Sequence, residues 1–591
     1  MKLKPDRSVN TSPTARQMHW LPSTTTEHDL SQYFWGNAQI HYYKPTAAFE
    51  WLGHECDIAV IDLRLGIDPN AIVARLGGIK AGGMALWIDS DGEPTQSSER
   101  FSVYGREPKS RYLHYLREAV AHYRAHKASA LTAQNPPIDV LIERLSGPKF
   151  LLRLAGRRGR GKTTALAAAL NVMPGAPIII SGKSATQAAV LLEKLTVAHQ
   201  FCGAQALLDN TEPDSIIVID EAASLPMSWL HQLAVSHPRL VLCGTDEGYE
   251  GSARGLFQKF AAQFPEMQTL HYATAYRFQA GDSLERWIDQ YIWCSGGEAA
   301  TFVDGDYPLD QNASISQLQA VFRLLHQSHY ATRPNDFRHL LDGPNLTIWV
   351  SVRGGQLSSA ACIAEEGPLA PEIVQSIIKG KRRPRGHLAP QILLRATGKK
   401  NLGADIFWRI VRIATVDDCQ SQGYGSGLLS AITEYAKGLG IDYLATSFSN
   451  QEKVVRFWQH NGFKKWHLGA KPSSETGQVS VLMGLKLQHG ADVYTELFSA
   501  IEPGYLQRID FQEDRQCAAV GEIAFADAIT RFREGYATLI DIYPLLYHLG
   551  TVEVPKTLID RPMNQAIDAL GGLKAATAFL RQHFEKQREH K

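Results

Sequence analysis

The sequence lacks the features that mark several broad classes of protein. Its 61 Lys and Arg residues nearly balance its 60 Asp and Glu residues. The resulting formal charge of +1 gives no indication that the chain as a whole binds a polyanion. No stretch approaches the ~20 apolar residues that cross a bilayer, and no apolar segment follows the first six residues as in a secretory leader. We therefore predict a soluble cytoplasmic protein with no membrane partner, in which any nucleic-acid site is a local patch.

Cysteine is scarce and scattered. The seven cysteines form no C-x-x-C pair and no cluster with histidine, which argues against a zinc site and a disulfide framework. No internal repeat or low-complexity tract is visible. At 591 residues the chain is too long for one hydrophobic core, so several domains are expected.

Two short glycine-rich loops, in contrast, stand out and differ in chemistry. The first, at 156–163, reads Gly-Arg-Arg-Gly-Arg-Gly-Lys-Thr and lies between an apolar stretch and an Ala-rich segment. Consecutive backbone N–H groups in such a loop, together with the N-terminus of the next helix, bind the phosphates of a nucleoside triphosphate. We predict that Lys162 contacts the β- and γ-phosphates and that the Thr163 hydroxyl binds Mg²⁺.

An apolar run at 216–219 ends in two acids, Asp220 and Glu221. A carboxylate pair at the end of a strand suits Mg²⁺ binding by Asp220 and polarisation of the attacking water by Glu221. Arg254 and Arg277 are both candidates for neutralising the charge on the γ-phosphate, and the sequence does not rank them.

The second loop, at 420–427, reads Gln-Ser-Gln-Gly-Tyr-Gly-Ser-Gly between a predicted strand and a predicted helix. Its N–H groups would bind the pyrophosphate of acetyl-CoA, with Ile413, Ala414 and Thr415 of the strand beside the pantetheine arm. The segment 456–463, Arg-Phe-Trp-Gln-His-Asn-Gly-Phe, is typical of the end of an acetyltransferase domain. The base for acyl transfer stays unknown.

The densest positive run of the chain, 379–387, reads Lys-Gly-Lys-Arg-Arg-Pro-Arg-Gly-His. Its charges would neutralise phosphates and position a nucleic acid without reading its sequence. We favour RNA contact over an ordinary solvated loop. The predicted RNA contacts are Lys379, Lys381, Arg382, Arg383, Arg385 and His387.

The alternation of apolar runs with helical patterns predicts an α/β protein of several domains. We expect an N-terminal α/β domain at 1–125, a RecA-like P-loop domain of the helicase type at 126–310, a GNAT acetyltransferase domain at 311–490 and a mainly helical C-terminal module at 491–591. The glycines Gly77, Gly78, Gly82 and Gly83 fit no nucleotide fingerprint, and we favour a structural loop there over a ligand contact.

Together these motifs resemble the tRNA(Met) cytidine acetyltransferases, the bacterial members of the RNA cytidine acetyltransferase family, over nearly the entire chain. The resemblance includes Asp-Glu-Ala-Ala at 220–223, Gly-Tyr-Glu-Gly at 248–251, His-Tyr-Ala-Thr at 329–332 and Arg-Ile-Ala at 412–414. It implies N4-acetylation of the wobble cytidine of elongator tRNA(Met) with acetyl-CoA, coupled to hydrolysis of ATP or GTP. It also implies tRNA binding by the C-terminal module and indicates no obligate protein partner.

The resemblance also assigns site residues by position. The implied nucleotide contacts are Gln134, Gly156, Arg157, Arg158, Gly159, Arg160, Gly161, Lys162, Thr163, Thr164, Ala165 and Arg277. The implied acetyl-CoA contacts are Ile413, Ala414, Thr415, Gln420, Ser421, Gln422, Gly423, Tyr424, Gly425, Ser426, Glu452, Lys453 and His460. One departure is Asp417, which stands where relatives usually have Pro and adds negative charge near a pyrophosphate.

Two other functions remain open at the level of sequence. An ATP-dependent protein acetyltransferase would acetylate lysine and would not need the basic segment. An RNA-remodelling ATPase that does not acetylate would use the acyl domain only as a binding platform, and it would not bind acetyl-CoA.

Overall fold

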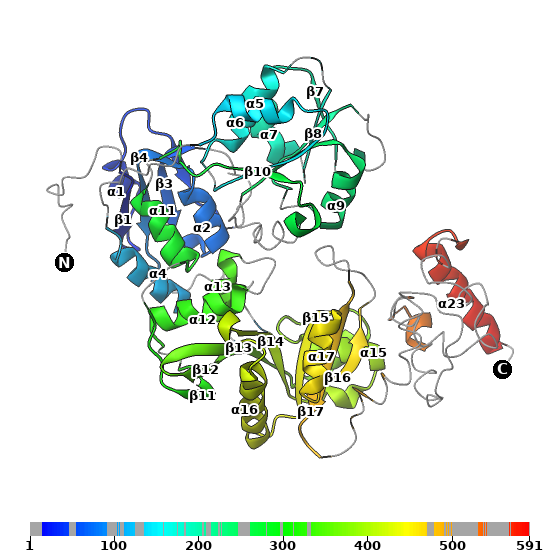
Figure 1. Ribbon diagram of the computed structural model, residues 1–591. Helices are drawn as coiled ribbons and strands as arrows, with labels where there is room; N and C mark the ends of the chain where they lie inside the picture. The colour runs from blue at the N-terminus through cyan, green and yellow to red at the C-terminus, as the bar shows by residue number, and fades with distance from the viewer. Residues whose placement is uncertain are drawn as a thin grey trace. The chain divides into compact units, whose positions relative to one another are not determined.

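The computed structural model divides into two compact units (Figure 1). The first contains Met1–Phe101, Pro108–Ala300 and Ser314–Gly343, and the second contains Ser102–Glu107, Thr301–Ala313 and Pro344–Lys591. The structure describes residues 15–45, 55–91, 103, 106, 111–124, 135–157, 159–173, 175, 177–182, 185–203, 206–207, 214–222, 225, 227–245, 260–278, 281–295, 299–310, 313–327, 333–469, 478–489, 492, 494–495, 498, 530–535, 537, 539, 567 and 569–589.

The first unit begins with a small parallel sheet in the order β1-β4-β3-β2. Asp68 caps a helix of this region by accepting hydrogen bonds from the N–H groups of Asn70 and Ala71, and Pro69 occupies the first helical turn. The predicted parallel α/β arrangement is confirmed. The elements are β1 (Gln17–Leu21), α1 (Glu27–Ser31), β2 (Ile40–Tyr42), β3 (Cys56–Asp62), α2 (Pro69–Leu76), β4 (Ile79–Ile88) and α4 (Arg111–Ala121).

A second parallel sheet follows in the order β10-β5-β9-β8-β6-β7. One strand, β9, separates the strand before the first glycine loop from the strand that ends at Asp220, as the predicted RecA type requires. The strands are β5 (Phe150–Ala155), β6 (Ile178–Ser181), β7 (His199–Phe201), β8 (Ile216–Ile219), β9 (Arg239–Cys243) and β10 (Gln268–His271).

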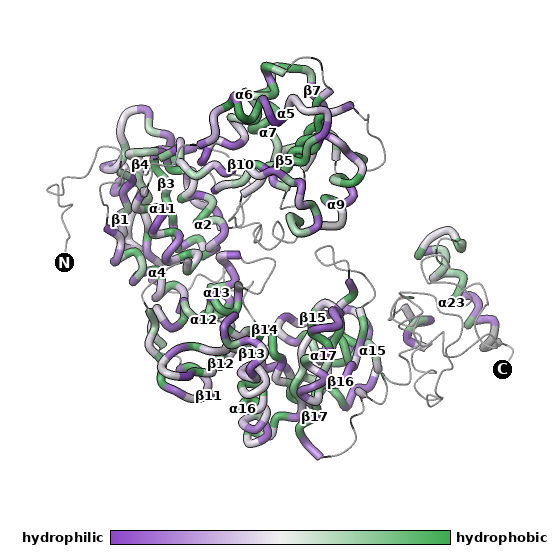
Figure 2. Tube along the Cα trace, in the orientation of Figure 1, coloured by the Kyte–Doolittle hydropathy of each residue, from purple (hydrophilic) through white to green (hydrophobic). Residues whose placement is uncertain are grey.

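Apolar cores cover both faces of this sheet, because its strands are hydrophobic on both sides. Figure 2 shows hydrophobic residues running through α6 and the neighbouring strands. The helices are α5 (Ile138–Leu145), α6 (Lys162–Asn171), α7 (Ala185–Lys194), α9 (Met227–Ser236) and α11 (Ser283–Trp287), which continues into a π-helical turn, Ile288–Ile292.

Two further helices, α12 (Ile315–Gln327) and α13 (Pro334–Asp342), belong to the first unit although they follow residue 310. On α13, Arg338 and Asp342 form a fully buried ion pair with a 3.0 Å separation. The Asp342 carboxylate also accepts a hydrogen bond of 2.9 Å from the Tyr112 N–H. This polar pair therefore ties the segment after residue 310 to α4.

The second unit contains a seven-stranded sheet in the order β11-β12-β13-β14-β15-β17-β16. Its strands are antiparallel neighbours except for β14 and β15, which run parallel. The strands are β11 (Gly305–Pro308), β12 (Leu346–Arg353), β13 (Gln356–Glu366), β14 (Phe407–Thr415), β15 (Tyr443–Ser449), β16 (Lys464–Leu468) and β17 (Ser480–Lys486).

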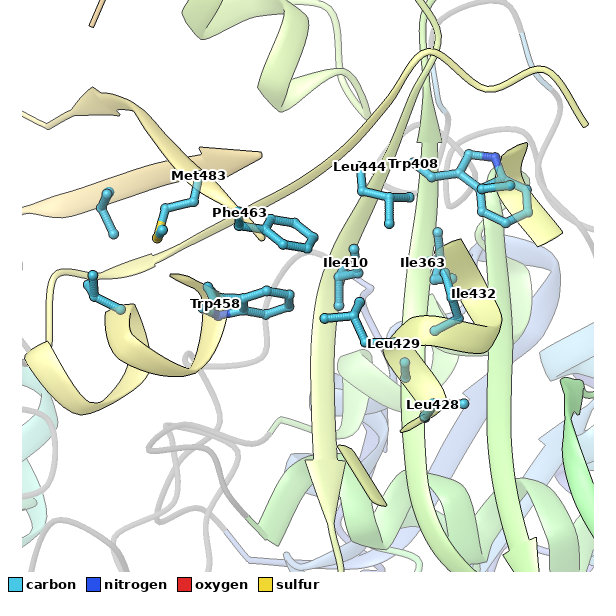
Figure 3. Packing of buried hydrophobic residues seen from close by; sticks show 14 of the residues in the cluster. Ile363, Trp408, Ile410, Leu428, Leu429, Ile432, Leu444, Trp458, Phe463 and Met483 are labelled. Carbon is cyan, nitrogen blue, oxygen red and sulfur yellow. The ribbon is translucent and has the colours of Figure 1, made fainter. Parts of the chain in front are cut away.

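One core of this unit lies between the sheet and α16, and a second packs α14 and α15 against sheet residues such as Phe407 and Tyr443. Leu428, Leu429 and Ile432 of α16 face the sheet residues Ile363 and Ile410 (Figure 3). The helices are α14 (Pro371–Ile378), α15 (Leu388–Thr397), α16 (Tyr424–Gly438) and α17 (Glu452–His460). This arrangement matches the predicted acetyltransferase domain.

The predicted helical module at 491–591 lies largely outside the described residues. Within the described part, α23 (Leu573–Glu589) is helical and Phe584 contacts Phe532 with ring centroids 6.5 Å apart. Across the described ranges of the chain, no helix combines the length and the apolarity needed to cross a bilayer.

Candidate functional sites

The first site is a pocket of about 470 Å³ at the carboxyl ends of the central strands of the second sheet. Parallel strands bring their carboxyl ends to one edge, so loops far apart in sequence meet there. The lining residues are Glu55, Lys80, Ala81, Gly159, Arg160, Gly161, Lys162, Thr163, Thr164, Val190, Asp220, Glu221, Cys243, Thr245, Tyr276 and Arg277. The structure thus brings the glycine loop, the acid pair and Arg277 together.

The glycine loop has a backbone that only glycine adopts easily at its critical positions. Gly156 has a φ of 144°, and a Cβ there would lie 2.3 Å from the Tyr272 carbonyl oxygen. Gly161 has a φ of 79° and sits against the Tyr276 ring. Asn135 fixes the loop further, because its side-chain amide donates to the carbonyls of Arg160 and Thr274.

The loop lysine is buried and turns back on its own loop. Lys162 Nζ donates hydrogen bonds to the carbonyl oxygens of Gly156, at 2.6 Å, and of Arg157, at 2.9 Å. These bonds hold the ammonium at the mouth of the loop and within the pocket lining. The geometry suits a cation that contacts the terminal phosphates of a nucleotide.

The acid pair lies where β8 ends. Burial, and then the neighbouring charge of Glu221, raise the pKa of Asp220 to about 7. Glu221 has a φ of 50°, a strained value for a residue with a side chain, and its buried Oε2 has no hydrogen-bond partner among the described residues. Both features suit a pair whose charge a bound cation would compensate, and Thr163 and Asp220, the predicted Mg²⁺ ligands, line the same pocket.

Some implied nucleotide contacts have other partners in the structure. The Arg157 guanidinium pairs with Asp289 at 2.5 Å, and that of Arg160 pairs with Glu285 at 2.5 Å. Ala165 packs against the hydrophobic core, and its N–H donates to the Gly161 carbonyl. Arg160 still lines the pocket, whereas Arg157 and Ala165 are not among its lining residues. These partners depend on contacts distant in sequence, which a local motif could not reveal, and the three nucleotide contacts stay predictions.

Other predicted residues are not placed. Gln134, Arg158 and Arg254 lie outside the described residues, so Arg277 is the candidate arginine that the described pocket contains. Sequence reasoning missed Glu55, Lys80 and Tyr276. They carry no motif, and their place in the pocket depends on contacts with segments distant in sequence.

The second site is a fork between the two parallel strands of the acetyltransferase sheet. β14 and β15 pair only from Phe407–Tyr443 to Ile410–Thr446. Beyond this point β14 pairs with β13 as far as Thr415, and β15 pairs with β17 as far as Ser449. Within 407–449, the facing backbone groups beyond the fork therefore have no partner in the opposite strand.

The fork is closed at its apex and irregular beside it. The Thr446 hydroxyl donates to the Ile410 carbonyl at 3.2 Å. The register of β13 and β14 shifts so that Val411 has no opposite residue. Ile413, Ala414 and Thr415, the predicted pantetheine contacts, lie on β14 beyond its pairing with β15.

The second glycine loop follows β14 and begins α16. Gly423 is the N-cap of the helix with a φ of 86°, and Ser421 has a φ of 60°. The N–H groups of the first helical turn have no intrahelical acceptor, so they form an anion site together with the helix dipole. Gly425 lies close to the strand, because a Cβ there would be 3.1 Å from Thr415 Oγ1.

The unusual acid before this loop has a local partner. The Gln420 side-chain amide donates to Asp417 Oδ1 at 2.7 Å, and that of Gln422 donates to the Asp418 carbonyl at 2.7 Å. Asp417 therefore fixes the approach to the loop by a hydrogen bond where Pro would fix it covalently.

Three of the implied acetyl-CoA contacts, Glu452, Lys453 and His460, lie on α17 and are exposed. Glu452 pairs with Arg456 on the same helix. Glu452 and His460 are eight residues apart, or ~12 Å along a helix, so they do not meet at one reacting atom. Phe457, between them, approaches Gly425.

The basic segment connects α14 to α15 as an anchored loop. The N–H groups of Lys381 and Arg382 donate to the Ser376 carbonyl, and Gly386 sits directly on Val103. Lys379, Lys381, Arg382, Arg383 and Arg385 are exposed. The loop therefore presents five cations from a fixed backbone.

His387 does not belong with these cations. It is 3% exposed, and its Nδ1 accepts a hydrogen bond of 2.8 Å from the Gly367 N–H. The buried Glu366 next to Gly367 accepts from the Ala389 N–H and pairs with Arg409. The prediction that His387 contacts RNA is thus wrong for this conformation, because its imidazole is part of the anchor.

The fold and the two sites define an acetyltransferase of the GNAT class joined to a nucleotide-binding domain of the helicase type. Three family profiles match the chain. They are "RNA cytidine acetyltransferase NAT10/TcmA, helicase domain" at residues 153–294, "GNAT acetyltransferase 2" at 320–441 and "tRNA(Met) cytidine acetyltransferase TmcA, N-terminal" at 8–128.

Curated relatives extend this result. The tRNA(Met) cytidine acetyltransferase TmcA of Vibrio cholerae is 34% identical over 475 residues, which cover 73% of this chain and 66% of the relative. The enzyme of the same name from Nitrosococcus halophilus is 30% identical over 511 residues, which cover 73% of this chain and 68% of the relative. This chain belongs to the tRNA(Met) cytidine acetyltransferase family, and its match spans about two thirds of the length of these relatives.

Among solved structures, the ribosomal-protein-S18-alanine N-acetyltransferase of Escherichia coli aligns with 32% of this chain and 98% of its own. It has 12% sequence identity and a TM-score of 0.23.

Proposed function

We propose that the protein acetylates N4 of the wobble cytidine in elongator tRNA(Met), with acetyl-CoA as donor, and uses ATP or GTP hydrolysis to position the RNA. Three observations support the proposal. One chain carries both the nucleotide pocket and the forked acetyltransferase sheet, the second unit presents a fixed cationic loop, and the named relatives are tRNA(Met) cytidine acetyltransferases. Such a reaction takes place with tRNA in the cytoplasm.

The fork supplies the position in which the acyl group is transferred. The lone pair of a cytosine N4 is delocalised into the ring, so precise placement against the thioester provides much of the rate. The β14 backbone groups beyond Ile410 that do not pair with β15 would orient the donor, while the first turn of α16 would bind its pyrophosphate. The bulge at Val411 frees one backbone position next to the fork for the developing oxyanion.

The RNA would be held by its phosphates. Lys379, Lys381, Arg382, Arg383 and Arg385 offer charge without sequence reading, so they would position an anticodon arm whose unpaired base costs little to extract. In the nucleotide pocket, Lys162 and Arg277 would neutralise phosphate charge while Thr163 and Asp220 hold Mg²⁺ and Glu221 orients water.

The direct test is to incubate the full-length protein with bulk tRNA, acetyl-CoA and ATP, and to analyse the digested nucleosides by mass spectrometry. We expect N4-acetylcytidine that maps to the wobble position of one tRNA. Acetyl-lysine in added protein, with no modified nucleoside, would contradict the proposal and favour a protein acetyltransferase. A Lys162→Ala protein that acetylates normally at saturating tRNA would refute obligatory coupling to hydrolysis.

A further inference from the structure

The nucleotide pocket includes residues from the N-terminal sheet. Glu55 immediately precedes β3, and Lys80 and Ala81 lie at the start of β4, yet all three line the pocket with the glycine loop. We propose that the N-terminal sheet completes the nucleotide site and that Glu55 is a positioning residue for the Arg277 guanidinium. The inference rests on the proposed nucleotide function of this pocket.

Three hydrogen bonds join Arg277 to the N-terminal sheet. Its Nε donates to Glu55 Oε1 at 2.9 Å, and its Nη1 donates to the Gly77 carbonyl at 2.9 Å. Its own carbonyl accepts from the Ala81 N–H at 3.0 Å. The guanidinium is therefore held in one orientation, with its side chain 14% exposed and that of Glu55 48% exposed.

The same residue is bonded to the phosphate loop. The N–H groups of Tyr276 and Arg277 both donate to the Gly159 carbonyl, at 2.8 and 3.3 Å. A Cβ on Gly159 would lie 3.2 Å from Arg277 Cβ, so the two backbones are in direct contact. Arg277 thus connects the loop that binds phosphates to the turn after α2. Gly77, one of the glycines interpreted as structural, contributes an acceptor to this link.

The Glu55 carboxylate at the rim of the pocket has a role in ordering the Arg277 guanidinium. An arginine that is ordered beforehand meets a terminal phosphate more favourably, because its side chain then loses less rotamer entropy on binding. Glu55 supplies this order by accepting from Nε, and the Gly77 carbonyl fixes the second nitrogen. If Glu55 is removed, the guanidinium keeps only the carbonyl as a side-chain partner among these contacts.

An ordinary half-exposed ion pair would contribute little to stability and nothing to hydrolysis. A double-mutant cycle distinguishes an ordinary ion pair from a positioning role of Glu55. It compares Glu55→Ala, Arg277→Ala and the double variant in the full-length protein. Glu55→Gln keeps an oxygen that accepts from Nε and serves as the conservative variant. Asp89→Ala is the matched control, because Asp89 pairs with Arg117 at 3.0 Å in the N-terminal region and does not line the pocket.

Binding of Mg²⁺–ADP and steady-state ATP hydrolysis are measured for each protein. We expect Glu55→Ala to lower kcat about tenfold and to change the ADP dissociation constant less than threefold, with Glu55→Gln and Asp89→Ala near the wild type. In the Arg277→Ala background, Glu55→Ala should have no further effect. An unchanged kcat in Glu55→Ala, or an equal tenfold loss in the Arg277→Ala background, would overturn the positioning role alone. Wild-type protein that fails to bind Mg²⁺–ADP would overturn the nucleotide site itself.

Discussion

The two glycine-rich loops of this chain bind, in our proposal, the same chemical group in different surroundings. In the nucleotide loop, a Cβ at Gly156 or Gly161 would meet protein atoms at 2.3 and 2.7 Å. In the acyl loop, Gly423 and Gly427 have no protein atom within 4 Å of a built Cβ. The first loop is therefore enclosed by its own fold, whereas the second is open at Gly423 and Gly427 and contacts the strand at Gly425.

The acids beside the two loops differ in the same way. Asp220 is buried beneath the nucleotide loop, while Asp417 is exposed and accepts a hydrogen bond from Gln420. A buried carboxylate requires a compensating cation, but an exposed one is solvated by water. In our proposal, a bound nucleotide and Mg²⁺ would therefore stabilise the first site strongly, whereas acetyl-CoA would bind a site whose shape exists without it.

The largest expected effect is that of Gly156→Ala, because its Cβ would collide with the Tyr272 carbonyl at a positive φ. We expect a loss of ~2–4 kcal/mol in the free energy of unfolding and the loss of nucleotide binding. Thermal unfolding and Mg²⁺–ADP titration measure both. Gly175→Ala is the control, since Gly175 has a φ of 81° but open space, and it should cost only ~1 kcal/mol. Equal losses in the two variants would remove the distinction between enclosed and open glycines.

The next effect concerns the buried acid and its pKa of about 7. Because this pKa lies above that of the unfolded chain, Asp220 lowers stability as the pH rises from about 4 to 7, and the loss is complete above that range. Asp220→Asn should therefore gain stability relative to wild type at pH 8, on the order of 3 kcal/mol, and little at pH 4. Denaturant unfolding at the two pH values, without metal, checks this. If the stability difference between Asp220→Asn and wild type were the same at both pH values, ionisation of Asp220 would not destabilise the fold.

In the acyl loop, Gly423→Ala should act on binding more than on folding. The strained φ costs ~1 kcal/mol and disturbs the N–H groups of the first turn, so we expect acetyl-CoA affinity to fall about tenfold with unchanged ATP hydrolysis. Calorimetric titration with CoA gives the affinity. Gly440→Ala is matched in φ, at 75°, and in open space, but it lies beyond the other end of α16. The Gly440→Ala protein should lose a similar free energy of unfolding and keep its affinity for acetyl-CoA.

The smallest effect should come from Gly427→Ala. This glycine lies inside α16 with open space around it, so alanine should raise the free energy of unfolding by ~0.5–1 kcal/mol through helix propensity. Affinity for CoA should change less than twofold. A large loss of affinity would show that the ligand, and not the protein, requires the absence of a Cβ there, and it would make the two loops more alike.

The sequence predicts elements that depend on neighbouring residues in the chain. It does not predict contacts between residues that are far apart in the chain. The strands before each loop, the helices after them and the acid pair at 220–221 follow from apolar runs, glycine spacing and charge, and the structure confirms them. The partners of Arg277 do not follow, because Glu55 and Gly77 precede it by 222 and 200 residues. His387 was misassigned for a related reason. Its neighbours in sequence are cations, but its neighbours in space are Gly367 and the buried Glu366 region.

The buried pair on α13 has a consequence for synthesis of the chain. Asp342 accepts the N–H of Tyr112, and the fully buried Arg338 donates to the Ile67 carbonyl, so a helix made late closes the interior of a region made early. A nascent chain that ends near residue 310 therefore exposes the surface that α12 and α13 later cover. On the ribosome, the first unit cannot reach its native state until residue 343 has left the exit tunnel.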